Sequence, residues 1–239
     1  MIRKIFVLLF VLLLFGSCAE QGPAGPAGAD GAGLICVSFQ QAAYPDAAYN
    51  GTTDTRIFDT SANSNYGGCF NLTVGRTATS IIARALIRFE ISGFIPNGAV
   101  IKKAYLTLRS YYFDGSEVLF VAHGITRSWT EGDGDCGGAN NVNATWSYYD
   151  GSTNPWTSAG GDFNNAAASD PINAGTTANY VTIEINPSLV QEWLDTPAKN
   201  YGLLIKSTNE TTTNHVGFYS SENGNVASRP RLTVYYTAP

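Results

Sequence analysis

The sequence predicts an all-β fold, a two-sheet β-sandwich with one short helix. Several segments alternate apolar and polar residues with a period of two, the pattern of half-buried strands. Charged residues are only 14% of the chain, Gly numbers 25 and Met occurs once. This composition is typical of an extracellular β-protein with long polar loops. We expect residues 34–239 to form one such domain, a common size for all-β folds.

The clearest alternation lies in residues 83–91, where Ala85, Ile87 and Phe89 share one face. Turn residues, among them Gly, Pro, Asn and Asp, separate the strand candidates. The other expected strands are 104–112, 118–125, 180–185, 202–206, 215–219 and 232–236.

One short helix is expected after Asn186, which is suited to cap it, with Pro187 at its first position and Pro197 ending it. Trp193 lies on the apolar stripe of this helix. We expect its ring to close one end of the core.

The N-terminus predicts export and anchoring. Residues 5–15 are continuously apolar and follow Arg3 and Lys4. At 11 residues the run is too short for a membrane span, which needs roughly 20, and it suits a signal peptide. Gly16-Ser17-Cys18 resembles a bacterial lipobox, which implies a signal peptide over 1–17 and lipidation of Cys18. A membrane-anchored, extracytoplasmic lipoprotein of the outer membrane or cell surface is expected, with ordinary signal cleavage as the alternative.

Residues 18–33 are expected to be a linker. Residues 22–31 repeat Gly-X-Y three times and begin a fourth, the collagen pattern. Three triplets are too few to hold a triple helix unaided. An extended spacer is therefore expected, and a trimeric collagen-like neck is the alternative.

Charge and cysteines limit the partners and the cross-links. Without residues 1–17 the chain carries 12 basic residues (14 less Arg3 and Lys4) against 19 acidic ones, and no basic stripe is visible, which excludes nucleic acid as an expected partner. After Cys18, the cysteines are Cys36, Cys69 and Cys136, in a disulfide-permissive compartment that leaves three pairings open. We favour Cys69–Cys136, because both residues lie in loops. Cys36–Cys69 is the rival.

Several motifs carry a resemblance in the expected order over roughly residues 40–237. They are 65–68 (NYGG), 72–75 (LTVG), 85–91 (ALIRFEI), 104–108 (AYLTL), 128–132 (SWTEG), 190–194 (VQEWL), 202–206 (GLLIK), 218–222 (FYSSE) and 229–234 (RPRLTV). Together they resemble the DNRLRE, or disaggregatase-related, domain. The resemblance implies a jelly-roll β-sandwich classed among carbohydrate-binding modules, with alginate-type polysaccharide among its ligands. The DNRLRE string itself is absent.

No catalytic residues are expected. The two histidines, His123 and His215, each lie inside a strand-like run, and no zinc-protease, nucleophile-elbow or phosphate-loop motif is present.

Glu131, Asp133 and Asp135 alternate in a Gly-rich segment, and one interpretation of this pattern is a structural calcium site. The EF-hand pattern fails at Cys136 and Val142, and the alternative is a solvated acidic loop.

Two groups of residues are candidates for a glycan. Trp146, Tyr148, Tyr149 and Trp156 crowd one stretch of the long polar segment after residue 131, and flat aromatic rings match the C–H faces of sugars. The two tryptophans have an alternative role, pinning the loop to the sandwich. Arg84, Arg88 and Arg109 would form a basic strip for uronate carboxylates if their strands were neighbours, and they are otherwise ordinary outer-face residues.

Two functions follow. The first is a non-catalytic, lipid-anchored surface protein that binds polysaccharide, with uronate-containing polysaccharide as a candidate ligand. The second is a structural or adhesive head on a collagen-like stalk, without a glycan ligand.

Overall fold

The computed structural model describes residues 33–114, 117–140 and 143–239. The leader, Cys18 and the Gly-X-Y repeat lie outside the described residues. The strands are β1 (Ile35–Phe39), β2 (Thr52–Phe58), β3 (Ser64–Asn65), β4 (Asn71–Arg76), β5 (Ile82–Phe89), β6 (Val100–Asp114), β7 (Leu119–Ile125), β8 (Ala139–Asn140), β9 (Tyr148–Asp150), β10 (Asn154–Pro155), β11 (Phe163–Ala167), β12 (Ile172–Asn173), β13 (Tyr180–Ile185), β14 (Leu203–Ser207), β15 (Asn214–Tyr219) and β16 (Arg231–Thr237), with one helix, α1 (Pro187–Asp195).

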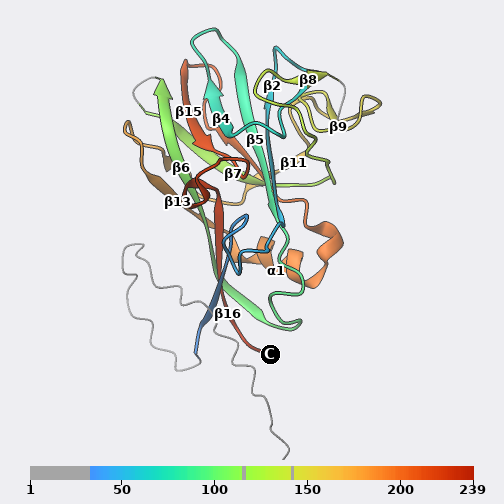
Figure 1. Cartoon of the computed structure of the whole chain (residues 1–239), viewed down its shortest axis with the longest axis vertical. Helices are drawn as coiled ribbons and strands as arrows, with labels where there is room; N and C mark the ends of the chain where they lie inside the picture. The colour runs from blue at the N-terminus through green and yellow to red at the C-terminus, as the bar shows by residue number, and fades with distance from the viewer. Residues whose placement is uncertain (1–32, 115–116, 141–142) are drawn as a thin grey trace, which may run out of the picture.

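The fold is an all-β sandwich made from one curled antiparallel sheet (Figure 1). Its main path runs β1-β16-β6-β15-β4-β5-β14-β7-β11, with β13 on β6, β12 on β7 and β2 on β5. β6 is long enough to join both halves, because its first part pairs with β16 and β13 and its end pairs with β15. The predicted all-β sandwich is therefore confirmed, with β6 joining the two halves of one continuous sheet rather than two separate sheets.

The main core lies between the two halves of this sheet. Leu106 of β6 and Val234 of β16 come from one half, and Ile87 of β5 and Phe218 of β15 come from the other. The alternation expected in 83–91 places Ile87 in this core.

α1 forms as the sequence predicts. The Asn186 side chain accepts a hydrogen bond from the backbone N–H of Ser188 at 2.9 Å, and Pro187 occupies the first turn. Trp193 is 2% exposed and belongs to the main core. Among the described residues, no helix is long and apolar enough to cross a membrane.

A second apolar cluster covers the outer face of β5 and β14, and it changes what the polar residues of β5 can do. Leu86 and Leu204 are fully buried there, beneath Trp129, Trp156 and other side chains of the long segment that follows β7. The face of β5 that carries Arg84, Leu86 and Arg88 is therefore covered over Leu86, rather than being an open polar face along its whole length.

One strand, the edge strand β2, was not expected from the sequence. β2 is rich in Thr and carries Asp54 and Arg56, and so does not resemble an apolar strand, yet it pairs with β5 along its whole length. β4 pairs with β15 from Asn71 to Arg76. The long segment after residue 131 also contains β9, β10, β11 and β12, which account for much of the apparent loop.

Candidate functional site

A disulfide joins the turn before β4 to the segment that follows β7. Cys69 and Cys136 are bonded, with their Cα atoms 4.6 Å apart, which confirms the favoured pairing and excludes Cys36–Cys69. Cys69 is buried and precedes β4, while Cys136 lies on the segment that follows β7. The bond therefore ties the 131–136 segment to the sandwich.

Asn65 makes four side-chain hydrogen bonds to the backbone, two of them to the same segment. Its side-chain amide is fully buried and donates to the carbonyl oxygens of Glu131 and Ala144. Its Oδ1 accepts the backbone N–H groups of Gly67 and Gly134. The backbones run so close here that a Cβ on Gly67 would meet the Gly132 carbonyl oxygen at 2.5 Å. The glycines of the Asn-Tyr-Gly-Gly motif are needed for this close approach.

The predicted calcium set is corrected by this anchoring. Glu131 comes together with Asp54 and Glu222, whose carboxylate oxygens lie within 4.8 Å of one another and of its own. Asp133 and Asp135 do not join it among the described residues: both are exposed, and Asp135 Oδ1 accepts the backbone N–H of Gly137. The reason is that the 131–134 backbone packs flat on the 65–68 turn, so its alternating side chains do not converge.

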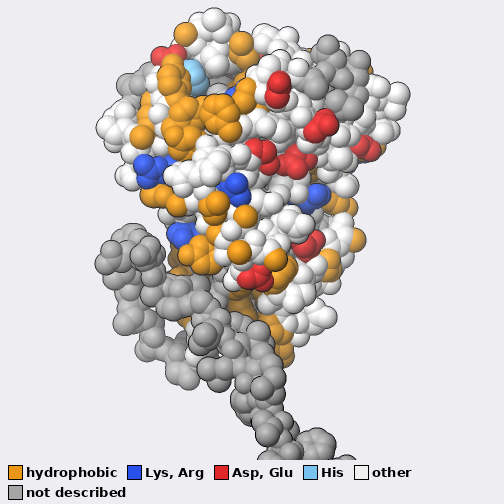
Figure 2. Space-filling view, viewed as in Figure 1, with side chains coloured by type: hydrophobic (Ala, Val, Ile, Leu, Met, Phe, Trp, Pro, Cys, Tyr) orange, Lys and Arg blue, Asp and Glu red, His pale blue; other side chains and the backbone are white. Residues whose placement is uncertain are grey.

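Burial dominates the electrostatics of this acidic cluster. The pKa of Asp54 is raised well above its ordinary value by burial and then by the charges of Glu222 and Glu131. Burial likewise raises the pKa of Glu131 to about 8, and the Glu222 charge adds to this effect. Figure 2 shows acidic side chains gathered over the side of the molecule where β2 and β9 lie.

The aromatic residues of the long segment mostly pin it to the sheet. Trp156 is 4% exposed and its indole N–H donates to the Thr145 carbonyl. The Tyr149 ring packs edge-on against Trp156. Trp146 also packs against the second cluster and is partly buried. Tyr148 is half-buried outside that cluster, so among the four it remains the candidate for an external contact.

The predicted strip of three arginines does not form. β5 and β6 are not neighbours in the sheet, so Arg109 is separated from Arg84 and Arg88 and stacks on Tyr180 of β13. Arg84 is committed to internal contacts, because it forms a two-pronged ion pair with Glu210 and lies over the Trp146 ring. The strip was expected only if the strands that carry the three arginines were neighbours, and they are not.

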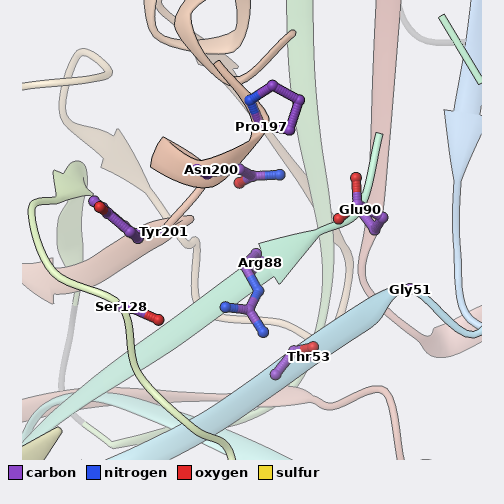
Figure 3. Close-up of a pocket in the computed structure, with 9 residues that line it drawn as sticks. Gly51, Thr53, Arg88, Glu90, Ser128, Pro197, Asn200 and Tyr201 are labelled. Atoms are coloured by element: carbon purple, nitrogen blue, oxygen red, sulfur yellow. The ribbon is translucent and has the colours of Figure 1, made fainter. Parts of the chain in front are cut away.

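Arg88 differs from the other two because it lines an open groove. The groove has a volume of about 350 Å³ and lies where β2 and β5 meet the segment after α1. Figure 3 shows the Arg88 guanidinium pointing toward Thr53 and Ser128, with Tyr201 and Glu90 at the sides. The lining residues are Gly51, Thr53, Arg88, Glu90, Ser128, Pro197, Ala198, Asn200 and Tyr201.

The groove is held rigidly from beneath. The Arg88 guanidinium lies over the buried Trp129 ring at 5.4 Å, and the Trp129 indole N–H donates to the Tyr201 carbonyl at 2.8 Å. Asn200 is buried and donates to the Phe89 carbonyl. Gly202 has φ +81°, and a Cβ there would meet the Ile87 carbonyl oxygen at 2.2 Å. Position 202, directly after Tyr201, therefore requires glycine.

Polar groups of the groove remain available. Within the described parts of the chain, the Arg88 guanidinium forms no hydrogen bond or ion pair. Burial lowers the pKa of Arg88, and the nearby charges of Glu131 and Glu90 partly offset this effect by raising it. Asn200 Oδ1 has no hydrogen-bond partner either, but it is buried and not open to the groove. Glu90 is already occupied by the backbone N–H and hydroxyl of Ser92. The sequence pointed to Arg88 but not to Thr53, Ser128 or Tyr201, which no common motif connects.

The fold is a β domain of the kind found in carbohydrate-binding-like modules, and the family to which the chain belongs agrees with this class. A family model described as the disaggregatase related repeat domain matches residues 54–234. The match covers more than half of the chain, and the chain belongs to this family. No curated protein matches it.

Proposed function

We propose that this domain binds a polysaccharide, without catalysis, in the groove around Arg88, and that a uronate carboxylate of the glycan contacts this arginine. The observation that carries the proposal is the unused donor capacity of a half-buried guanidinium in an open groove. A planar guanidinium can bind a carboxylate through two parallel hydrogen bonds, which are stronger than neutral ones.

The rest of the groove suits a sugar chain. Tyr201 offers a partly exposed ring to the apolar face of a sugar, and its rigid backbone limits the entropy lost on binding. Thr53 and Ser128 carry hydroxyl groups. These groups match the many hydroxyls of a polysaccharide.

The carboxylate content of the groove favours binding over hydrolysis. Glycoside hydrolysis needs a pair of carboxyl groups on either side of the scissile bond. Among the described residues that line the groove, Glu90 is the one carboxylate, and Ser92 already holds it.

Arg88→Gln tests the site. Because a hydrogen bond to a charged group contributes about 1.5–3 kcal/mol, we expect this variant to weaken binding to alginate or polygalacturonate by about 10- to 100-fold. Affinity electrophoresis or calorimetry on the purified protein measures this loss. Arg109→Gln is the matched control, because Arg109 also stacks on an aromatic ring but lies on β6.

The outcomes separate the alternatives. Equal loss in both variants, or none in Arg88→Gln, contradicts the assignment of the groove. If the protein binds neutral glucans but not polyuronates, the contact between Arg88 and a uronate carboxylate is contradicted, while polysaccharide binding itself is not. Absence of binding to any polysaccharide favours the alternative, a structural or adhesive head domain.

We further propose that Cys18 is lipidated and anchors the domain outside the cytoplasm, on the strength of the lipobox resemblance. Cys18→Ser is expected to abolish incorporation of labelled fatty acid and to move the protein out of the membrane fraction. A variant that still incorporates label contradicts the proposal.

A further inference from the structure

Three carboxylates from distant parts of the sequence converge at one edge of the sandwich. Asp54 lies in β2, Glu131 follows β7, and Glu222 follows β15. One ligand oxygen from each lies within 4.8 Å of the other two. Like charges this close repel, so the folded protein holds them together against their electrostatic preference.

Asp54 makes the cluster more than a group of surface acids. The residue is 0% exposed, and its Oδ1 has no hydrogen-bond partner. The charged groups that act on it are Glu222 and Glu131, both acidic. A buried carboxylate with an unsatisfied oxygen is costly unless a cation or a donor compensates it.

Hydrogen bonds fix the other oxygens of the cluster. Asp54 Oδ2 accepts the backbone N–H of Ser221 at 2.9 Å, and Glu222 Oε1 accepts the Ser221 hydroxyl at 2.8 Å. Glu131 Oε1 accepts the backbone N–H of Asp54. Each carboxylate is thus oriented through one oxygen, and the second oxygen of each has no hydrogen bond within the described residues.

We propose that Asp54, Glu131 and Glu222 together bind one Ca²⁺ ion. Calcium takes six to eight oxygen ligands at about 2.3–2.6 Å, so two oxygens on one ion lie at most about 5 Å apart, which the cluster satisfies. The ligands are all hard oxygens, without the sulfur or imidazole that Zn²⁺ prefers. Waters complete the shell on the side of Glu222.

The ion would join three segments that pairing alone does not connect. β2 pairs with β5, whereas the 131–136 segment is held by Asn65 and the Cys69–Cys136 bond, and Glu222 lies on the turn beyond β15. A cation at their meeting point stabilises all three at once. This inference does not depend on the proposed glycan groove.

Calorimetric titration with CaCl₂ of the purified protein, previously freed of metal with EGTA, tests the site. We expect one ion per chain, with a dissociation constant below about 1 mM, and weaker binding of MgCl₂. In thermal denaturation, 5 mM CaCl₂ is expected to raise the melting temperature by about 3–8 °C.

Glu222→Gln gives a readout that a merely structural glutamate would not. In EGTA this variant is expected to be at least as stable as the wild-type protein, because one repelling charge is gone, while its response to CaCl₂ is lost. Asp133→Asn, an exposed acid of the same segment, serves as the control and should keep the full response.

Three results overturn the proposal. The first is the absence of both heat and thermal shift with CaCl₂ in the wild-type protein. The second is a calcium response retained in Glu222→Gln. The third is a response lost equally in Asp133→Asn.

Discussion

Replacing both Cys69 and Cys136 with Ala is expected to lower the free energy of unfolding by about 4 kcal/mol. The bond spans a sequence separation of 67 residues, and loop-closure entropy for a loop of this length predicts a stabilisation of about that size. For a domain of roughly 200 residues the melting temperature should fall by about 8–16 °C. Denaturant unfolding of the non-reduced double variant measures the effect.

The disulfide effect has a direct internal check. Treating the wild-type protein with a reductant should reproduce most of the loss, and the double variant should lose less on reduction than the wild-type protein does. A loss under about 1 kcal/mol would show that the 131–136 segment is held almost entirely by Asn65 and its neighbours, and that the covalent bond is redundant.

Asn65→Ala is expected to destabilise the domain by about 3–5 kcal/mol. The side chain is fully buried and its four hydrogen bonds serve four backbone groups. Truncation leaves these groups without partners, and each unsatisfied buried group costs about 1–3 kcal/mol before relaxation or entry of water. Chemical denaturation monitored by tryptophan fluorescence measures the loss.

Asn165→Ala is the matched control for this prediction. Asn165 lies in β11, is exposed and has no side-chain hydrogen bond among those described, so its truncation should change stability by less than about 0.5 kcal/mol. If Asn65→Ala were equally mild, the close packing of the 65–68 turn on the 131–134 backbone would have to persist without its amide.

The Cys69/Cys136 double variant and Asn65→Ala also bear on the acidic cluster, because both release the segment that carries Glu131. Calcium binding should weaken in each of them, since one of the three carboxylates would lose its fixed position. Binding of polyuronate should weaken less, because Trp129 and Tyr201 hold the groove through a separate hydrogen bond.

The sequence alone determined those elements whose signals are local. The helix could be placed because Asn186, Pro187 and the apolar stripe through Trp193 act within a few residues of one another. β13 coincides with its predicted range because Val181, Ile183 and Ile185 alternate with exposed residues along one half-buried strand. Period-two patterns report burial on one face, and both signals remain readable without knowledge of the partner strand.

β2 escaped prediction because its alternation involves charge rather than apolarity. Asp54 and Arg56 share one face of β2, where Arg56 donates a hydrogen bond to Asn71. Ile57 lies on the opposite face, in the second apolar cluster. A strand that is stabilised by pairing and by polar contacts leaves only a weak signal in composition. The buried acid was visible in the sequence, but its burial was not.

The candidate sites were decided by tertiary structure. The sequence indicated Glu131, Arg88 and the Cys69–Cys136 pair, since each belongs to a residue type with a limited set of roles. It did not pair Glu131 with Asp54 and Glu222, nor separate Arg88 from Arg109, because these relations depend on which strands are neighbours. Residues more than 70 positions apart meet only when strand order and loop anchoring are fixed. The fold class could therefore be predicted from local periodicity, whereas the geometry of the sites is visible only in the folded chain.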